Sequence, residues 1–320
     1  MKRIAVILVD WNGIEVTLPC LQSLNAVKPS DKYSIELIVV DNGSTIPILD
    51  RIKNMYSDVV VFRSEENRGF AAGCNVGIRY AIESGIDYSL LLNNDTSVEP
   101  DFLSHLFDSI EGNPTVGLAQ PKILFQHDKN LIWNAGNRFN KWIGLTSTNG
   151  YGEKNSNKYD SITTMPWATG CCMLINNKLF TGEGLGLLNE KYETYYEDVE
   201  FSFRVREKGY RISYVPSSIV YHIAGYSVNS NQETQEGPTH PFVVYLHSRN
   251  RIFLLREFSS WYVMPTLVLY QIMYYTLLIL RFLLLCRPKK LRAVLRSISD
   301  GISNSYDSMN RSFSSPIVRC

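Results

Sequence analysis

Residues 88–96 read Tyr88-Ser89-Leu90-Leu91-Leu92-Asn93-Asn94-Asp95-Thr96, an apolar run that ends directly in a triplet of amide and acid side chains. The apolar run predicts a strand, and a run without alternation is typical of strands buried on both faces of a parallel sheet. In open sheets of this kind, ligands bind beyond the carboxyl ends of the strands. Carboxylate and amide oxygens at such an end predict a site for a divalent metal and a charged phosphate ester.

Three earlier segments repeat this pattern of a short apolar strand followed by polar residues. The strands are Ile4 to Val9, Ile35 to Val40 and Val59 to Phe62, and the polar clusters after them are Asp10-Trp11-Asn12, Asp41-Asn42-Gly43-Ser44 and Asn67-Arg68-Gly69. Helical patterns lie between them, with Leu18, Leu21 and Leu24 on one face, Ile48, Ile52 and Met55 on another, and small residues from Ala71 to Ile82. This alternation predicts βαβ units and an α/β fold with a mostly parallel sheet.

The pattern becomes mixed after residue 115. Asn134 to Asp160 is polar and rich in Gly and Asn, and we expect it to form a mobile loop over the site. Ala168 to Ile175 predicts a further strand, and a helix is expected to begin near Glu197. His222 ends one more predicted strand.

The composition is that of a folded protein, with 45% hydrophobic residues in a chain of 320. The formal net charge of +1 hides an asymmetry, because residues 249–320 hold 11 Lys or Arg against 3 Asp or Glu, whereas the residues before them hold 21 against 28. The 6 cysteines include no Cys-x-x-Cys pair, so neither a disulfide framework nor a zinc site is predicted, and a reducing compartment fits best. Asp10 interrupts the first apolar run, which favours a buried strand over a signal peptide.

The C-terminal part of the chain contains a long apolar stretch with basic residues after it. Trp261 to Leu280 is almost free of charge and is followed by Arg281, by Phe282 to Cys286 and by Arg287-Pro288-Lys289-Lys290. About 20 apolar residues are enough to span a bilayer, although Pro265, Gln271 and Arg281 weaken that interpretation. The alternative is a helix packed on the core. Apolar length, aromatic residues and basic charge together favour membrane contact over residues 261–286, whether spanning or interfacial. We expect a catalytic domain over 1–238 and a helical region over 239–320.

Each strand-end motif also has a purely structural interpretation. Asp41 is placed to hydrogen-bond a base or ribose, but an Asx turn uses the same residues. Arg68 precedes a helix whose small first residues admit a phosphate to unpaired amide groups, although such a helix also packs tightly on a sheet. Asp95 can supply one oxygen to Mg²⁺ or Mn²⁺ bridging a diphosphate, or it can cap a helix. The metal interpretation is favoured once His222 is counted.

Tyr195-Tyr196-Glu197-Asp198 opens the predicted helix near residue 197. Carboxylates at a helix start are stabilised by the helix dipole, and this explanation applies to any such helix. It does not account for two tyrosines and two acids side by side before an apolar stripe. A carboxylate held there can accept a proton from an attacking hydroxyl. His222 alone would be a structural histidine, but it follows this helix by one strand, a natural route back to the same sheet edge.

Together these residues resemble the large inverting family of glycosyltransferases, family 2, that includes bacterial rhamnosyltransferases of surface-polysaccharide assembly. The matching segments occur in the family's order and are Val9-Asp10-Trp11-Asn12, Val39 to Ser44, Asn67 to Asn75, Leu91 to Thr96, Trp167-Ala168-Thr169-Gly170, Asn189 to Tyr192, Tyr196 to Glu200 and Val215-Pro216 through His222. The resemblance implies a GT-A type nucleotide-sugar fold, here with a C-terminal helical, membrane-associated extension. It also implies a single in-line displacement that inverts the sugar.

The resemblance implies roles for individual residues. Asp198 would be the general base, with Glu197 beside it, and Asp95, Asn93 and His222 would bind Mg²⁺ or Mn²⁺. The nucleotide sugar would contact Val9, Trp11, Asp41, Asn42, Arg68, Asn75 and Asn94, and the acceptor would contact Trp167, Gly170 and Glu190. Asn93 departs from the family pattern, because many relatives carry the first acid of an Asp-x-Asp triplet there. An amide ligand weakens the hold on a divalent ion.

The expected reaction is transfer of a sugar, rhamnose from dTDP-rhamnose, to a lipid-linked saccharide in O-antigen or similar synthesis. The expected partners are the nucleotide-diphosphate sugar, this acceptor and the cytoplasmic face of the bacterial inner membrane, without nucleic acid. The alternatives are another sugar such as galactose or glucose, or a catalytically weak, membrane-bound sugar-binding protein. A dinucleotide oxidoreductase would need G-x-G-x-x-G after the first strand, where the chain has Asp10-Trp11-Asn12-Gly13. A processive synthase would carry Gln-x-x-Arg-Trp, which the sequence lacks.

Overall fold

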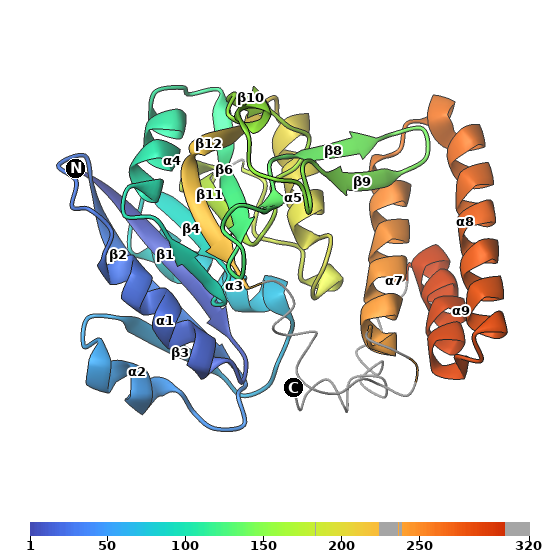
Figure 1. Cartoon of the computed structure of the whole chain (residues 1–320), viewed down its shortest axis with the longest axis horizontal. Helices are drawn as coiled ribbons and strands as arrows, with labels where there is room; N and C mark the ends of the chain where they lie inside the picture. The colour runs from blue at the N-terminus through green and yellow to red at the C-terminus, as the bar shows by residue number, and fades with distance from the viewer. Residues whose placement is uncertain (183, 224–235, 237–238, 305–320) are drawn as a thin grey trace. The chain divides into compact units, whose positions relative to one another are not determined.

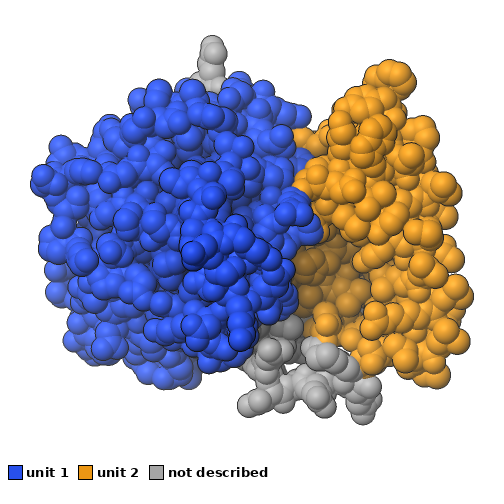
Figure 2. Space-filling view, turned by 45° about the horizontal axis from the view of Figure 1, so that its top comes forward, with its two compact units in different colours: residues 1–138, 147–193, 197–224 blue, residues 139–146, 194–196, 225–320 orange. Residues whose placement is uncertain are grey.

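The computed structural model describes residues 1–182, 184–223, 236 and 239–304. The chain divides into two compact units, which Figure 2 shows in different colours. Unit 1 comprises residues 1–138, 147–193 and 197–224, and unit 2 comprises residues 139–146, 194–196 and 225–320.

Unit 1 is built on a mixed, mostly parallel sheet (Figure 1). Its described strands are β1 (Lys2–Asp10), β2 (Tyr33–Asn42), β3 (Val60–Ser64), β4 (Tyr88–Leu92), β5 (Thr96–Val98), β6 (Val116–Phe125), β7 (Ile132–Asn134), β10 (Thr163–Thr164), β11 (Cys172–Asn176) and β12 (Arg211–His222). Their order is β10-β12-β6-β11-β4-β1-β2-β3, with β5 paired to β12 and β7 paired to β6. Strand β11 runs antiparallel to both of its neighbours. The predicted α/β fold with a mostly parallel sheet is confirmed.

The register of the first strands brings their polar ends to one edge of the sheet. Asp10 at the end of β1 lies beside Asp41 at the end of β2. On the other side of β1, Ile7 lies beside Leu91 of β4, whose residues are all buried. The polar clusters that follow these three strands therefore belong to the same carboxyl edge, as the sequence predicted.

Helices cover both faces of this sheet (Figure 1). In unit 1 they are α1 (Ile14–Asn25), α2 (Leu49–Met55), α3 (Phe70–Glu83), α4 (Phe102–Glu111) and α5 (Glu197–Glu207). Alternate side chains of β1 point to opposite faces, as in any strand. Val6 lies in one core with Leu21 of α1 and Leu106 of α4, whereas Ala5 lies in the other with Ile78 of α3. The unbroken apolar strands are the consequence of this burial on two sides.

Small residues let α3 approach the sheet closely. A Cβ atom on Gly73 would lie 2.7 Å from Cγ1 of Val9, and one on Gly77 would lie 2.6 Å from Cγ2 of Ile7. Real Cβ atoms essentially never come this near, so any larger residue at either position would force the strand side chain or the helix to shift. The tight packing of this small-residue helix on the sheet, one of the two interpretations of its sequence, is present.

The prediction of a mobile loop over Asn134 to Asp160 was wrong. The segment contains β8 (Asn137–Asn140) and β9 (Leu145–Thr148), which pair with each other, and a 3-10 helix at Asn157–Tyr159. Two of its asparagines, Asn134 and Asn137, are buried and hydrogen-bonded to Gln120 of β6. The strand predicted over 168–175 is also shorter, since β11 begins at Cys172.

The described helices of unit 2 are α7 (Pro241–Phe258), α8 (Met264–Leu284) and α9 (Pro288–Ser303). Helix α9 packs against both α7 and α8. Each helix carries a proline in its first turn, where the missing N–H is not needed. The stretch Trp261–Leu284 is the only one in the described part of the chain that is long and apolar enough to cross a membrane, and 17% of its most apolar window is buried.

Candidate active site

Asp10 organises the carboxyl end of β1. Its carboxylate is fully buried and accepts hydrogen bonds from Thr17 Oγ1 at 2.5 Å, from Gly13 N at 3.2 Å and from Asn94 Nδ2 at 3.3 Å. Burial raises the pKa of Asp10. Asn94, expected to contact nucleotide, also donates to Thr17 Oγ1 at 2.8 Å, so both amide hydrogens go to the chain itself.

Asp41 lies at the end of β2 with a cationic partner that sequence reasoning missed. Arg63 Nη1 is 2.5 Å from Asp41 Oδ2, and the carboxylate is 1% exposed. Ser44 N donates to Asp41 Oδ1 at 2.8 Å, a local side-chain bond like that of the structural alternative, although it spans three residues and not the two of an Asx turn. Arg63 pairs with Asp41 because β2 and β3 are parallel neighbours with these two residues in register. The only signal in the sequence was a charged residue near the end of an apolar strand.

Trp11 and Val9 lie at the end of β1. Trp11 is half-buried, and its indole Nε1 is buried without a hydrogen-bond partner among the described residues. A buried donor in this state costs about 1–3 kcal/mol unless a ligand or water accepts from it. Val9 is half-buried against α3 at Gly73. Of these two residues, Trp11 therefore has a donor to offer to a ligand.

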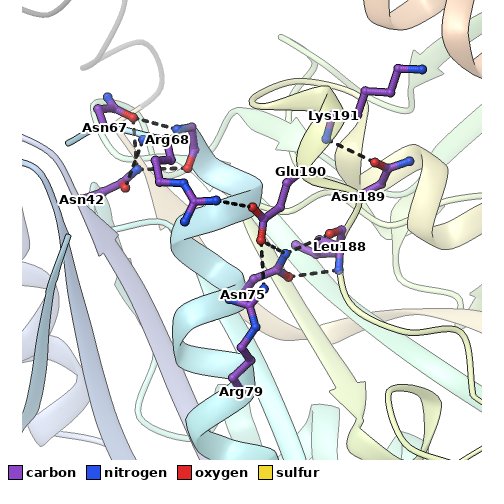
Figure 3. A network of polar contacts seen from close by, with 10 residues as sticks. Asn42, Asn67, Arg68, Asn75, Arg79, Leu188, Asn189, Glu190 and Lys191 are labelled. Carbon is purple, nitrogen blue, oxygen red and sulfur yellow. Dashed lines mark hydrogen bonds and ion pairs between the residues drawn. The ribbon is translucent and has the colours of Figure 1, made fainter. Parts of the chain in front are cut away.

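Glu190 gathers three residues of the α3 region into one cluster (Figure 3). Its carboxylate lies 2.9 Å from Arg68 Nη2 and 3.1 Å from Arg79 Nη2, and accepts from Asn75 Nδ2 at 3.0 Å. Burial opposes ionisation, but Asn75 and the two arginines lower the pKa of Glu190 below its ordinary value. Asn75 also exchanges hydrogen bonds with the backbone of Leu188. Arg68, which was expected to contact the nucleotide, is therefore paired with a carboxylate of the chain itself.

Asn42 holds the turn that leads into α3. Its Nδ2 donates to Asn67 Oδ1 at 3.1 Å and to Gly69 O at 3.0 Å (Figure 3). Gly69 has φ +85°, and a Cβ there would lie 2.7 Å from Glu193 O, so this position requires glycine. The amide of Asn42 thus fixes the backbone ahead of the helix.

Asp95 and His222 come together at the end of the central strands. Asp95 Oδ1 is 3.1 Å from His222 Nε2, because β5 pairs antiparallel with the end of β12 and places His222 beside Thr96. His222 Nδ1 is buried without a partner among the described residues. Burial by itself lowers the pKa of His222, but Cys171 and Asp95 raise it to about 10.

The donor set at this strand end fits a divalent metal that is shared with a diphosphate. Such an ion needs only one or two protein ligands, with phosphate and water completing its shell, and Mn²⁺ accepts both carboxylate and imidazole. Asp95 and His222 supply one of each, and both are nearly buried. Asn93, two residues before Asp95, is half-buried, and its backbone N–H donates to Cys171 O. Within the described residues, no group of three or more His, Cys, Asp or Glu side chains is arranged to hold a metal unaided.

Glu197 and Asp198 begin α5 in unequal surroundings. Asp198 accepts from Gly170 N and from Val199 N, each at 2.8 Å. Glu197 Oε2 is buried and has no partner among the described residues. Burial raises the pKa of both groups, and the neighbouring Asp198 charge raises that of Glu197 further. Glu197 is therefore the carboxyl that favours its proton, and Asp198 is the one equipped to be ionised.

A buried amide network supports the segment that binds Asp198. Gln120 Oε1 accepts from Thr169 N at 2.8 Å and from Asn137 Nδ2 at 2.9 Å, and Asn137 also donates to Trp167 O. Trp167 is buried, and its Nε1 donates to Arg138 O. Gly170 follows with its N–H on Asp198. Sequence reasoning missed Gln120, although a glutamine inside an apolar strand was the available signal.

The turn before α5 has an unusual backbone. Glu193, Tyr195 and Tyr196 have φ of 59°, 70° and 69°, a region that bulky residues rarely adopt. Inside unit 2, Asn250 Nδ2 donates to Thr194 O at 3.0 Å and to Tyr195 O at 2.8 Å. Residues held in such conformations cluster at functional sites. The paired tyrosines drew attention in the sequence, whereas Asn250 gave no signal there.

Comparison with known proteins adds a family match. The family described as glycosyl transferase family 2 matches residues 5–181. The low-salt glycan biosynthesis hexosyltransferase Agl10 of Haloferax volcanii is 28% identical over 229 residues, which cover 70% of this chain and 68% of that protein. The dTDP-rhamnosyl transferase RfbF of Shigella flexneri is 23% identical over 70% of each chain. An N-acetylglucosaminyl-diphospho-decaprenol L-rhamnosyltransferase of Mycobacterium tuberculosis is 24% identical over 72% of this chain and 78% of its own.

Solved structures share the fold at low identity. The mannosyltransferase PcManGT of Pyrobaculum calidifontis, crystallised with GDP-Man and Mn²⁺, has a TM-score of 0.55 and 15% identity over 99% of this chain and 80% of its own. GalNAc-T7, crystallised with UDP, GalNAc and Mn²⁺, has a TM-score of 0.56 and 19% identity over 77% of this chain. The match spans about half of GalNAc-T7, 47% of its length.

Proposed function

Since the chain belongs to glycosyl transferase family 2 and is a glycosyltransferase, we propose that it transfers a sugar from a nucleoside-diphosphate donor to a lipid-linked saccharide with inversion at the anomeric carbon. The observation that carries this proposal is the position of Asp198. Its two backbone hydrogen bonds favour the carboxylate, in a setting whose burial raises its pKa toward neutrality.

In the proposed reaction, Asp198 takes the proton of the acceptor hydroxyl as that oxygen attacks the sugar. Glu197 keeps its own proton, because a second charge beside Asp198 is unfavourable in a buried site. Gly170 orients Asp198 through its N–H, and Trp167 and Glu190 are the other residues we assign to the acceptor. Donor and acceptor thus meet at a base that is fixed before they bind.

We assign seven residues to the nucleotide, namely Trp11, Asp41, Asn42, Arg68, Val9, Asn75 and Asn94. The indole N–H of Trp11, which has no acceptor within the described parts of the chain, supports its part in this assignment. Asp95 and His222, with Asn93 adjacent, would hold Mg²⁺ or Mn²⁺. When bound, the metal supplies charge neutralisation for the leaving diphosphate.

Rhamnose from dTDP-rhamnose is the donor we propose, and a lipid-linked saccharide of O-antigen or similar synthesis is the acceptor. Two relatives named as rhamnosyltransferases support the sugar, and the name of the mycobacterial relative supports the lipid-linked acceptor. Such acceptors would place the enzyme at the cytoplasmic face of the bacterial inner membrane. Agl10, named as a hexosyltransferase, keeps glucose and galactose in the donor panel.

The test is a panel of nucleotide sugars scored by release of nucleoside diphosphate, with and without an extract of lipid-linked acceptors. We expect acceptor-dependent release from dTDP-rhamnose and loss of that release in Asp198→Asn. Acceptor-dependent release from another donor, and not from dTDP-rhamnose, would show that the donor sugar is not rhamnose but would leave the proposed transfer reaction in place. Nucleotide binding without any release across the panel would instead mean a sugar-binding protein and overturn the proposed reaction.

A further inference from the structure

We propose that unit 2 docks on an anionic membrane with α8 lying flat in the lipid interface, and that α8 does not span the bilayer. The inference rests on the proposed action on lipid-linked acceptors and adds how the enzyme meets the lipid. Every contact that carries it lies within unit 2.

One face of α8 is apolar and exposed to solvent. Leu269 is 71% exposed, Ile272 61% and Leu277 58%. The exposed apolar residues recur every three or four positions and so share one stripe, namely Leu269, Ile272, Met273, Leu277, Leu280 and Leu284. A stripe of this length on a folded protein marks an interaction surface.

The opposite face of α8 packs on the rest of unit 2 through apolar and polar groups, with Tyr275 and Phe282 buried in a cluster with Val294 of α9. Gln271 Nε2 donates to Ile143 O at 2.8 Å, in the turn between β8 and β9, and Thr266 Oγ1, exposed in the first turn of α8, donates to Trp142 O of the same turn at 3.1 Å. Tyr275 OH donates to Ser248 O of α7 at 2.9 Å. The face of α8 opposite the stripe is therefore already occupied within unit 2, which leaves the apolar stripe as the exposed surface of the helix.

These attachments exclude a spanning position for the folded unit. Arg251 of α7 stacks 4.4 Å from the ring centre of Tyr274, and Arg249 of α7 is fully buried. If α8 crossed the hydrocarbon with its packing intact, these cations and the β8–β9 turn would enter the bilayer. Charged groups at that depth are costly, and irregular backbone that faces lipid does not occur there. A helix lying flat immerses only its apolar stripe.

Basic and aromatic residues at the two ends of α8 fit a lipid surface. Trp261, 84% exposed, precedes the helix, and such rings prefer the headgroup level. Arg281, Lys289 and Arg292 are exposed at and beyond its other end. Lys290 is not available to headgroups as its sequence context indicated, because it is buried and donates to Glu236 O at 2.7 Å.

The same charges favour lipid over a second copy of the chain. A parallel pairing of α8 stripes would bring like basic residues near one another, and an antiparallel pairing would offer them no acidic residue of α8, whereas anionic headgroups neutralise them. The partner proposed is therefore an anionic bilayer.

The first experiment asks on which side of the membrane the two ends of α8 lie. Cys286 is exposed after α8, whereas Cys20, Cys74, Cys171 and Cys172 are buried. With Cys320→Ser as background, a membrane-impermeant maleimide is applied to intact spheroplasts and to inverted vesicles. A second variant carries Ser260→Cys and Cys286→Ser. Flat docking requires both positions to label only in inverted vesicles, and labelling of one end from outside would overturn the proposal.

The second experiment measures binding to vesicles of anionic and of neutral lipid by flotation, without donor or acceptor, so it stands or falls separately from the transferase activity. Gln at Arg281, Lys289 and Arg292 should weaken binding to anionic vesicles about a hundredfold at low salt, since each basic residue near such a surface contributes about fivefold. Gln at the exposed Lys53, Lys154 and Lys178 of unit 1 is the matched control and should change little. Equal loss in both triple variants, or dimers that persist without lipid and vanish in Leu269→Glu with Leu277→Glu, would refute lipid docking.

Discussion

Asp198 and Glu197 are adjacent carboxyl groups, yet the chain treats them differently. Asp198 has two backbone N–H donors, and Glu197 Oε2 has no partner in the described structure. Asp198→Asn keeps the size of the side chain and removes the site that accepts a proton. We expect turnover to fall about a hundredfold or more, with nucleotide affinity unchanged, because a general base contributes at least that much. Initial rates and nucleotide titration measure the two effects.

Glu207→Gln, at the exposed end of the same helix, is the control for this variant. It should retain full turnover. The pKa of Asp198 is raised, so the acid limb of the wild-type rate profile should lie above the ordinary aspartate range. Near-normal turnover in Asp198→Asn would assign the base elsewhere, with Glu197 or Glu190 next in line.

Glu197 should make the fold less stable as the pH rises. Its pKa in the folded protein is raised, so the folded state holds the proton more tightly than the unfolded chain, and stability is lost from the ordinary glutamate pKa upward. Glu197→Gln removes the ionisation and should gain stability relative to wild type between about pH 5 and pH 8. Urea unfolding at several pH values measures this difference. A difference that does not change with pH would contradict the buried, protonated state.

Asp95 and Asn93 test the metal assignment. Asp95→Ala should remove the Mn²⁺-dependent part of nucleoside-diphosphate binding, whereas Asn93→Asp adds a charged ligand and should tighten it. Calorimetric titration with and without Mn²⁺ measures both variants against wild type. Equal affinities under all conditions would show that the end of β4 carries no metal.

At the scale of elements, α3 and β1 meet through glycines. Gly77→Ala should destabilise the fold by about 1–3 kcal/mol, because its Cβ would lie 2.6 Å from Cγ2 of Ile7. Ile7→Ala opens space at the same contact, so the double variant should be more stable than the sum of the two losses predicts. Denaturant midpoints of the three variants give the coupling. Simple additivity would mean that α3 shifts to accommodate the methyl group.

The strands and helices of the first hundred residues were predictable because their signals are local. An unbroken apolar run such as Tyr88 to Leu92 is typical of a buried strand. The helical patterns between consecutive strands predict that these strands run parallel. The antiparallel insertion of β11 between β4 and β6 was not predictable, since pairing between distant segments leaves no local pattern. The β8–β9 hairpin was missed because Asn-rich sequence is read as solvated, and Gln120 reverses that expectation.

The candidate site divides in the same way. His222 was expected to return to the sheet edge that carries Asp95, and the pairing of β5 with β12 brings it there. The partners of Asp41 and Arg68 were not foreseen, because Arg63 and Glu190 approach from other elements. Glu197 and Asp198 differ in their surroundings, since Glu197 Oε2 is buried without a partner among the described residues. Two adjacent acids in a sequence give no sign of such a difference. The sequence therefore indicated the candidate site residues more readily than the hydrogen bonds and ion pairs that hold their side chains in place.

At the scale of the whole molecule, catalysis and membrane docking should be separable, because they use different side chains. Leu269→Glu with Leu277→Glu changes only exposed positions of α8, so the fold should be preserved. Transfer to a soluble acceptor analogue should stay within about twofold of wild type, whereas transfer to lipid-linked acceptor in anionic vesicles should fall about tenfold or more, since each buried apolar side chain adds to interfacial binding. Ile162→Glu, at an exposed apolar position of unit 1, should leave both rates unchanged. If the double variant lost transfer to both acceptors equally, α8 would have a role in catalysis. If it transferred sugar to lipid-linked acceptor in vesicles at the full rate, membrane docking through α8 would not be needed for the reaction.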